Sequence, residues 1–118
     1  MLFRSSVPTG TVLTMQAGSA AQILLAWEDP EKIRRGLQSA KFNASVLSAV
    51  RRRGWAQSVG EREPGVASVS APVRGPNGKV IAAVSISGPV ERLSRQPGRL
   101  HSAAVVATAA RLTEFISK

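Results

Sequence analysis

Two stretches in the second half of the chain have the residue pattern of β-strands. Residues 66–74 and 79–87 are rich in Val, Ile and Ala, and they flank Gly75-Pro-Asn-Gly78. The Asn-Gly pair in that segment is a strong hairpin signal, because both residues tolerate a positive φ. The pattern predicts an antiparallel hairpin. A connecting loop of two or four residues leaves the same side chains of the two strands together on each face of the hairpin. A loop of three residues would turn the side chains of one strand to the opposite face.

The two faces of this hairpin differ in chemistry. A two-residue loop sets Ser70 opposite Ser85 and Ser68 opposite Ser87, so four hydroxyls share one face. Small side chains leave room and hydroxyls both donate and accept hydrogen bonds, which suits a pocket for a small polar ligand. Serines that simply face solvent are the alternative. The other face is expected to carry Val69, Val73, Val80, Val84 and Ile86.

Two segments in the first half of the chain are predicted to be helices with recognisable starts. Residues 19–27 contain helix formers and no helix breaker, with Gly18 or Ser19 as the N-cap. A second helix begins at Asp29-Pro30, because Asp favours the N-cap and Pro the first helical position.

Two further helices precede and follow the hairpin. Asn43 is expected to cap a helix whose last turn holds Arg51-Arg-Arg53 and whose stop is Gly54. Residues 97–118 repeat apolar side chains at helical spacing and predict one long helix. With antiparallel strands between helices, the fold class is α+β, a sheet with helices packed against it.

For two single residues, Trp55 and His101, we expect a structural role rather than a functional one. Trp55 follows the Gly54 helix stop, and we expect it to anchor the core rather than to stack on a nucleotide base. His101 falls in the first turn of the long helix, where we expect a surface residue rather than a ligand or a base.

Composition argues against most enzyme classes. The 118 residues include no Cys and one His, which excludes a thiolate metal site or a Cys nucleophile and disfavours a zinc site or a Ser/His triad. Glu61 and Glu63 lie close together, but no second acidic cluster faces them. No Gly-rich phosphate cradle is present. We therefore expect no catalysis, no cofactor and no metal.

Charge and hydropathy bear on partners and location. The chain carries 16 Lys and Arg against 7 Asp and Glu, a net charge of +9, which is compatible with nucleic acid, an acidic partner or a basic surface with no ligand. No apolar run approaches the roughly 18 residues of a membrane span. The start, MLFRSS, lacks the apolar stretch of a signal peptide. We expect a cytoplasmic protein with no membrane partner.

A series of motifs resembles a known domain. Arg51–Trp55 reads Arg-x-x-Gly plus an aromatic, Glu61–Gly65 reads Glu-x-x-Pro-Gly, and Ala71–Val73 reads small-Pro-Val. The Asn-Gly hairpin and Val84-Ser-Ile-Ser-Gly-Pro89 follow. In this order the motifs resemble the effector-binding domain of IclR-family bacterial transcriptional regulators. Gly18–Ala26 is similar to that family's small-Ala-x-Gly-Lys-Ala-x-Leu-Ala segment, so the resemblance covers nearly the whole chain.

The resemblance implies a GAF-like α+β fold, an antiparallel sheet flanked by helices, that binds a small metabolite, often an organic or aromatic acid. In the family a winged helix-turn-helix domain reads operator DNA, and effector binding changes how homodimers or homotetramers hold that DNA. The implied partners are a small-molecule effector, operator DNA through the winged helix, and further copies of the chain. We expect residues 1–118 to be an effector-binding domain that is incomplete at its N-terminal side, without the winged helix, and Met1 need not be a natural start.

The resemblance also implies a set of pocket residues. The family's pocket is lined from the start of the first helix, the segment after the Gly-aromatic pair, and the two central strands. The matching positions are Leu13, Ser19, Ala20, Ser58, Val66, Ser68, Ser85 and Ser87. Three of the four hairpin serines belong to this set.

This sequence departs from the family pattern at several of these places. Ala21 and Gln22 replace a frequent Gly and Lys, Ser58 stands where many members have an acid, and Ser70 stands where Ala is usual. The implied pocket is lined by hydroxyls without a fixed charge. With the backbone N–H groups at the helix start around Gly18, such a pocket suits a carboxylate.

Two other functions remain open from sequence. The segment Lys32–Arg53 holds seven Lys and Arg residues and no acid, so its face is a candidate nucleic-acid-binding module, whose affinity would fall steeply with salt. The exposed strands or the long C-terminal helix would instead serve a pure oligomerisation domain.

Overall fold

A three-stranded antiparallel sheet lies at the centre of residues 18–117, the part of the chain that the computed structural model describes. The strands are paired in the order β1-β2-β3, with bounds β1 Ala56–Val59, β2 Val66–Arg74 and β3 Val80–Pro89. The expected α+β class is confirmed.

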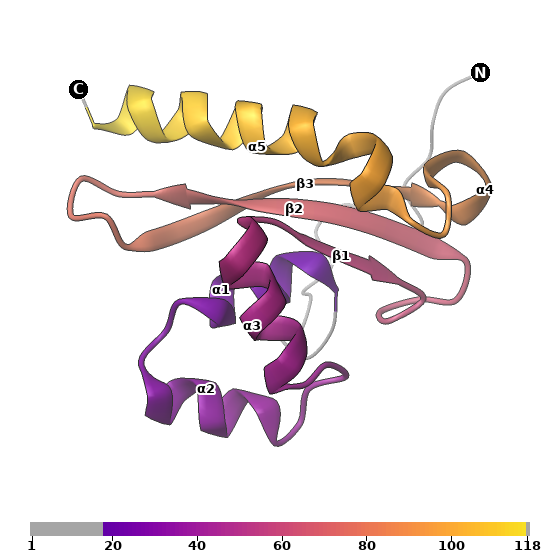
Figure 1. The fold of residues 1–118 in the computed structure, drawn as a ribbon, viewed down its shortest axis with the longest axis horizontal. Coiled ribbons are helices and arrows are strands. Elements are labelled where there is room, and N and C mark those ends of the chain that lie inside the picture. Colours follow the sequence, from indigo (N-terminus) through magenta and orange to yellow (C-terminus); the bar gives the residue numbers. More distant parts are fainter. Residues whose placement is uncertain (1–17, 118) are drawn as a thin grey trace, which may run out of the picture.

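Helices cover both faces of this sheet (Figure 1). On one side lie α1 Ser19–Ala26, α2 Pro30–Leu37 and α3 Ala44–Arg53, and on the other side lies α5 Pro97–Ile116. The short helix α4, Val90–Leu93, connects β3 to α5. The sheet is thus the middle of three layers.

The helix boundaries follow the local signals in the sequence. The Asp29 side chain accepts a hydrogen bond from the Lys32 N–H at 3.0 Å, and Asn43 accepts one from the Val46 N–H at 3.0 Å, so both expected N-caps are confirmed. α3 ends at Gly54, whose φ of 86° is the left-handed conformation that glycine adopts without steric cost.

The hairpin has the expected register but not the expected loop. Ser68 pairs with Ser87 and Ser70 with Ser85, as predicted. The loop, however, has three residues, because the Gly75 N–H donates to the Lys79 carbonyl and the Gly78 N–H donates to the Gly75 carbonyl, both at 2.9 Å. Within this loop only Gly78 has a positive φ.

A β-bulge reconciles the three-residue loop with the register. Val73 pairs with Ala82 and Arg74 pairs with Val80, so β3 contributes one extra residue at this step. The three-residue loop turns the side chains of β3 to the opposite face of the hairpin, and the bulge turns them back. It also corrects one expectation: Val80 packs against the hydrophobic cluster on the α1 side, not on the Val/Ile face.

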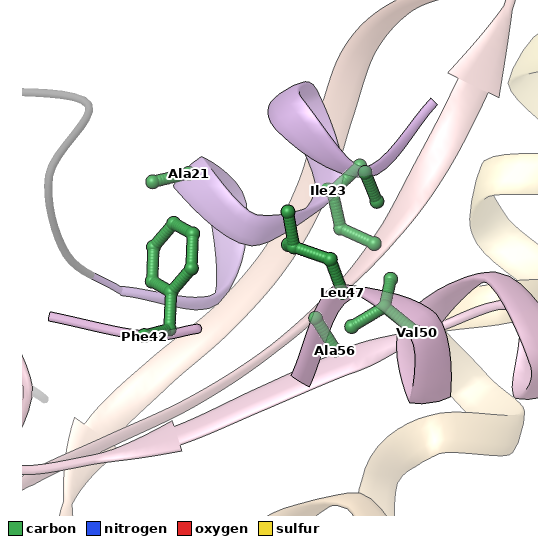
Figure 2. Close-up of a cluster of buried hydrophobic side chains, with 7 residues drawn as sticks. Ala21, Ile23, Phe42, Leu47, Val50 and Ala56 are labelled. Carbon is green, nitrogen blue, oxygen red and sulfur yellow. The ribbon is translucent and has the colours of Figure 1, made fainter. Parts of the chain in front are cut away.

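Two hydrophobic clusters hold the layers together. The first fills the space between α1, α3 and the sheet, with Ile23, Leu47 and Val50 fully buried (Figure 2). The second joins β2 to α5 through Val69, Ala71, Val73, Val105 and Ala109. Each large side chain buried in this way stabilises the fold by roughly 1.5–3 kcal/mol.

Trp55 links the start of β1 to the start of α5. Its half-buried side chain packs against the second cluster, as expected of a core anchor, and the Arg53 guanidinium lies 4.0 Å from the ring centroid. A Cβ on Gly98 would lie 2.1 Å from the Trp55 ring, so only glycine fits there. His101 is half-buried rather than fully exposed, and its Nε2 is inaccessible, without a hydrogen-bond partner among the described residues.

Candidate ligand-binding site

Serine hydroxyls from four elements form a continuous hydrogen-bonded row on the α1 side of the sheet. The Ser58 hydroxyl lies 2.8 Å from that of Ser68, which lies 2.7 Å from that of Ser19. Ser19 continues to Ser70 at 2.6 Å, and Ser70 continues to Ser85 at 2.5 Å. The row thus runs from β1 through β2 and α1 to β3. We call these five residues the serine row.

One hydroxyl hydrogen of the serine row is not used in bonds within the row, and the direction of donation along the row is not fixed. Each hydroxyl has one donor and two acceptor sites, so four bonds among five hydroxyls leave one O–H hydrogen for an outside partner. Either atom can donate in each bond, so the free hydrogen can be directed to the Ser58 end or to the Ser85 end. Ser19 and Ser70 are fully buried, whereas Ser85 is exposed, so Ser85 is the end that an external acceptor can reach.

The structure brings most of the proposed site residues to one place. Ser19, Ser58, Ser68 and Ser85 are members of the serine row. Of the remaining positions, Ser87 is exposed beside its partner on β2, Val66 is half-buried at the start of that strand on the same face, and Ala20 is half-buried in the first turn of α1. Leu13 lies outside the described residues.

Ser70 is the member of the row that the proposed set lacked. It is fully buried and bonded to both Ser19 and Ser85, so it joins the two halves of the row. The signal was present in the alternation of the strands, which placed all four hairpin serines on one face. The set of pocket residues implied by the family resemblance did not include Ser70.

The start of α1 is occupied by a carboxylate of the protein itself. The Gly18 N–H donates to Glu61 Oε1 at 3.1 Å, and Gln22 Nε2 donates to Glu61 Oε2 at 2.9 Å. Gln22 is fully buried and also donates to the Gln57 carbonyl at 3.2 Å. Sequence reasoning did not assign Glu61 or Gln22 to the site. The N–H group expected to be open to a ligand at Gly18 is therefore already in use.

Comparison with known proteins identifies the family. The model of the bacterial transcriptional regulator IclR C-terminal domain matches residues 2–114. The chain belongs to the IclR family. It corresponds to the C-terminal, effector-binding domain of these regulators, which are not enzymes.

Individual relatives agree with this assignment. The HTH-type transcriptional regulator KdgR of Escherichia coli K12 is 32% identical over 101 residues, which cover 70% of this chain and 38% of KdgR. The chain therefore spans well under half the length of that relative.

Solved structures share the fold of this IclR domain. A protein from Silicibacter sp. TM1040, assigned to the IclR transcriptional regulators, superposes with a TM-score of 0.84 at 26% identity, over 96% of this chain and 49% of that one. The C-terminal domain of E. coli KdgR superposes with a TM-score of 0.70 at 28% identity, over 88% of this chain and 71% of that one. The GAF-like sheet flanked by helices is thereby confirmed.

The basic segment of this IclR domain is largely engaged within the molecule. Lys32 pairs with Glu28, and Arg34 and Arg35 pair with Glu31. These acids lie just before the segment, so a count over residues 32–53 alone overlooks them. The hydrogen bond to Glu31 raises the pKa of Arg34 above its ordinary value.

Two arginines at the end of α3 also have structural partners. Arg51 donates to the Ala26 carbonyl at 2.8 Å, at the C-terminus of α1, where a cation is favoured. Arg53 donates to the Trp55 carbonyl at 2.9 Å. Partial burial lowers the pKa of Arg53 from its ordinary value, and the charge of Arg52 adds to this effect. Five of the seven cations therefore have a partner within the molecule, although the ion pairs of Lys32, Arg34 and Arg35 are exposed.

Two further features bear on partners. Within residues 18–117, no group of three or more His, Cys, Asp or Glu side chains is placed to hold a metal ion. No helix in the same part of the chain has the length and hydrophobicity to cross a bilayer.

Proposed function

We propose that this IclR domain senses a small organic or aromatic acid through the serine row. Ser85 and Ser87 hold the carboxylate or carbonyl of the ligand, and Ser58 and Ser68 complete the polar contacts. Leu13, Ala20 and Val66 supply apolar walls, and Ser19 orients the row from α1. The observation that carries the proposal is the row itself, whose spare hydrogen reaches an exposed end at Ser85.

The chemistry of the row suits an acceptor ligand. A carboxylate offers two acceptor oxygens, and hydrogen bonds to an ionised acceptor are roughly twice as strong as those between neutral groups. Ser70 and Ser19 are buried, so the hydroxyl that donates to the ligand is itself oriented by the hydroxyls behind it. A bound acid would determine which hydroxyl donates in each hydrogen bond of the serine row.

We propose that the sensed acid acts on transcription through the longer regulator. The effector changes how a homodimer or homotetramer of the parent protein holds operator DNA, which is read by a winged helix-turn-helix domain, in the cytoplasm. The support is membership of the family, together with a length well under half that of KdgR.

Thermal unfolding against a panel of small mono-, di- and aromatic carboxylic acids tests the proposal. An acid at about a hundred times its dissociation constant adds roughly 2.7 kcal/mol to the stability, which raises the midpoint by on the order of 10 °C. Replacing Ser85→Ala or Ser87→Ala should weaken binding of an active acid by about 1–3 kcal/mol, because a buried polar group of the ligand loses its partner.

Ser48→Ala is the matched control, because Ser48 is exposed on α3 and lies outside the serine row. It should leave the affinity of the same acid unchanged. Equal affinity in the wild type, Ser85→Ala and Ser87→Ala would show that the acid binds elsewhere.

A further inference from the structure

Glu61 binds at the start of α1 much as a ligand carboxylate would. Its two oxygens accept separate hydrogen bonds, one from the Gly18 N–H and one from Gln22 Nε2. α1 has no acid in its first turn and no side-chain cap of its own, so this carboxylate from the β1–β2 turn takes the position that the helix dipole favours for an anion. Ser19, the residue after Gly18, is itself a member of the serine row.

The site is only partly satisfied by Glu61. Gln22 is 0% exposed, and Oε1 of its amide is buried without a hydrogen-bond partner among the described residues, although Nε2 of the same amide binds Glu61. A buried acceptor without a donor is destabilising, and a carboxylate has no hydrogen to give it. Gln22 therefore retains capacity for a hydroxyl or N–H donor.

Positive charge at the same place favours an anion over a neutral ligand. The Nε atom of Arg62 lies 3.3 Å from the position that a Cβ on Gly18 would occupy. The guanidinium therefore sits beside the helix start to which Glu61 is bound.

We propose that Glu61 is an internal competitor of the effector's carboxylate, and that a hydroxy acid is the ligand best fitted to displace it. The incoming carboxylate accepts from the Gly18 N–H and Gln22 Nε2, and its neighbouring hydroxyl donates to Gln22 Oε1. The carbonyl or a second carboxylate of the same acid is then the group that Ser85 and Ser87 hold. Displacement releases the turn between β1 and β2 from α1. This inference rests on the proposed function, because it gives a class to the acid that the serine row senses.

A purely structural tie predicts something different. If Glu61 only pins the β1–β2 turn to α1, its removal destabilises the fold and no dissolved anion repairs the loss. If Glu61 fills a site for free carboxylates, a small dissolved carboxylate restores the stability that is lost when Glu61 is removed. Chemical rescue therefore distinguishes the two.

Acetate is the first probe, with thermal unfolding as the readout. Glu61→Ala should lower the midpoint, and acetate should restore it, relative to chloride at equal ionic strength. Glu63→Ala removes a carboxylate of the same turn, but it is Glu61 that accepts the hydrogen bonds from Gly18 and Gln22, so this variant should show no acetate-specific shift. If Glu61→Ala does not fold, Glu61→Gln keeps the shape and removes the charge, and acetate should stabilise it more than the wild type.

Glycolate, which is acetate with a neighbouring hydroxyl, tests the role of Gln22. It should rescue Glu61→Ala at a concentration about tenfold lower than acetate, and Gln22→Met should abolish that advantage. Absence of acetate-specific rescue in both Glu61 variants, or equal rescue in Glu63→Ala, overturns the inference.

The two proposals fail in different ways. If the wild type binds an acid through Ser85 and Ser87 but Glu61→Ala does not bind that acid more tightly, the competitor role is wrong and the sensing role stands. If Glu61→Ala is rescued by acetate while Ser85→Ala and Ser87→Ala leave acid affinity unchanged, the anion site is supported and the assignment to the serine row is wrong.

Discussion

At the scale of single residues, Gly98 is the glycine of residues 18–117 with the least space for a side chain, because it packs against Trp55. The Gly98 N–H donates to Gln57 Oε1 at 2.9 Å, while the indole ring lies where a side chain on Gly98 would have to go. Strand β1 is thereby fixed against the first turn of α5. The contact is between rigid groups, since neither the backbone nor the indole can yield as a flexible side chain would.

Gly98→Ala should therefore destabilise the domain by about 1–3 kcal/mol, the usual cost of overpacking. Thermal or urea unfolding measures the loss. In a Trp55→Leu background the methyl group has space, so the additional cost of Gly98→Ala should largely disappear. Additive effects of the two substitutions would show that the clash is not the cause.

Residue-scale prediction succeeded where the partner lies close in sequence. The caps at Asp29 and Asn43 bond to N–H groups three residues away, so the sequence pattern contains the whole interaction. The bonds from Glu61 to Gly18 and Gln22 span 43 and 39 residues, and no local pattern encodes them. The same holds for Ser19, which reaches the hairpin serines only because α1 lies across the sheet.

At the scale of elements, the β2–β3 hairpin has the predicted register, but it reaches that register through a three-residue loop and a β-bulge instead of a loop of two or four residues. An odd loop and a one-residue bulge each exchange the faces of a strand, and together they leave Ser68, Ser70, Ser85 and Ser87 on one side. The Asn-Gly signal located the turn but did not determine its length. Strand β1 and helix α4 were not predicted, because four residues are too few to show a period.

The three-residue loop makes a specific demand on Gly78, whose φ is 81°. Gly78→Ala should cost about 1–2 kcal/mol, because an L side chain in the left-handed region meets its own backbone. Gly78→Asn should cost less, since Asn tolerates this conformation better than other side chains. Equal destabilisation by the two substitutions in urea unfolding would contradict the assignment of strain to φ.

At the scale of the whole molecule, the sheet separates the side that carries the proposed ligand site from the side that packs against α5. The α1 side carries the serine row and Glu61, and the α5 side is joined to the sheet through Val105 and Ala109. The predicted stripe of α5 continues to Leu112 and Ile116, yet these remain 42% and 38% exposed. The last two turns of the helix therefore present apolar surface beyond the part that the sheet covers.

A second copy of the chain is the partner that we expect on this surface. Phe115, beside the stripe, is 73% exposed, and clustered apolar side chains of this size typically mark an interface. Phe115→Glu should shift the domain from dimer toward monomer in light scattering, because a charge cannot be buried there without a partner. Ala107→Glu adds the same charge to an exposed position of α5 on the side away from the stripe of Leu112 and Ile116, and should leave the mass unchanged. A wild-type domain that remains monomeric at high concentration would contradict assembly through α5 and move the interface to a part of the regulator outside this surface.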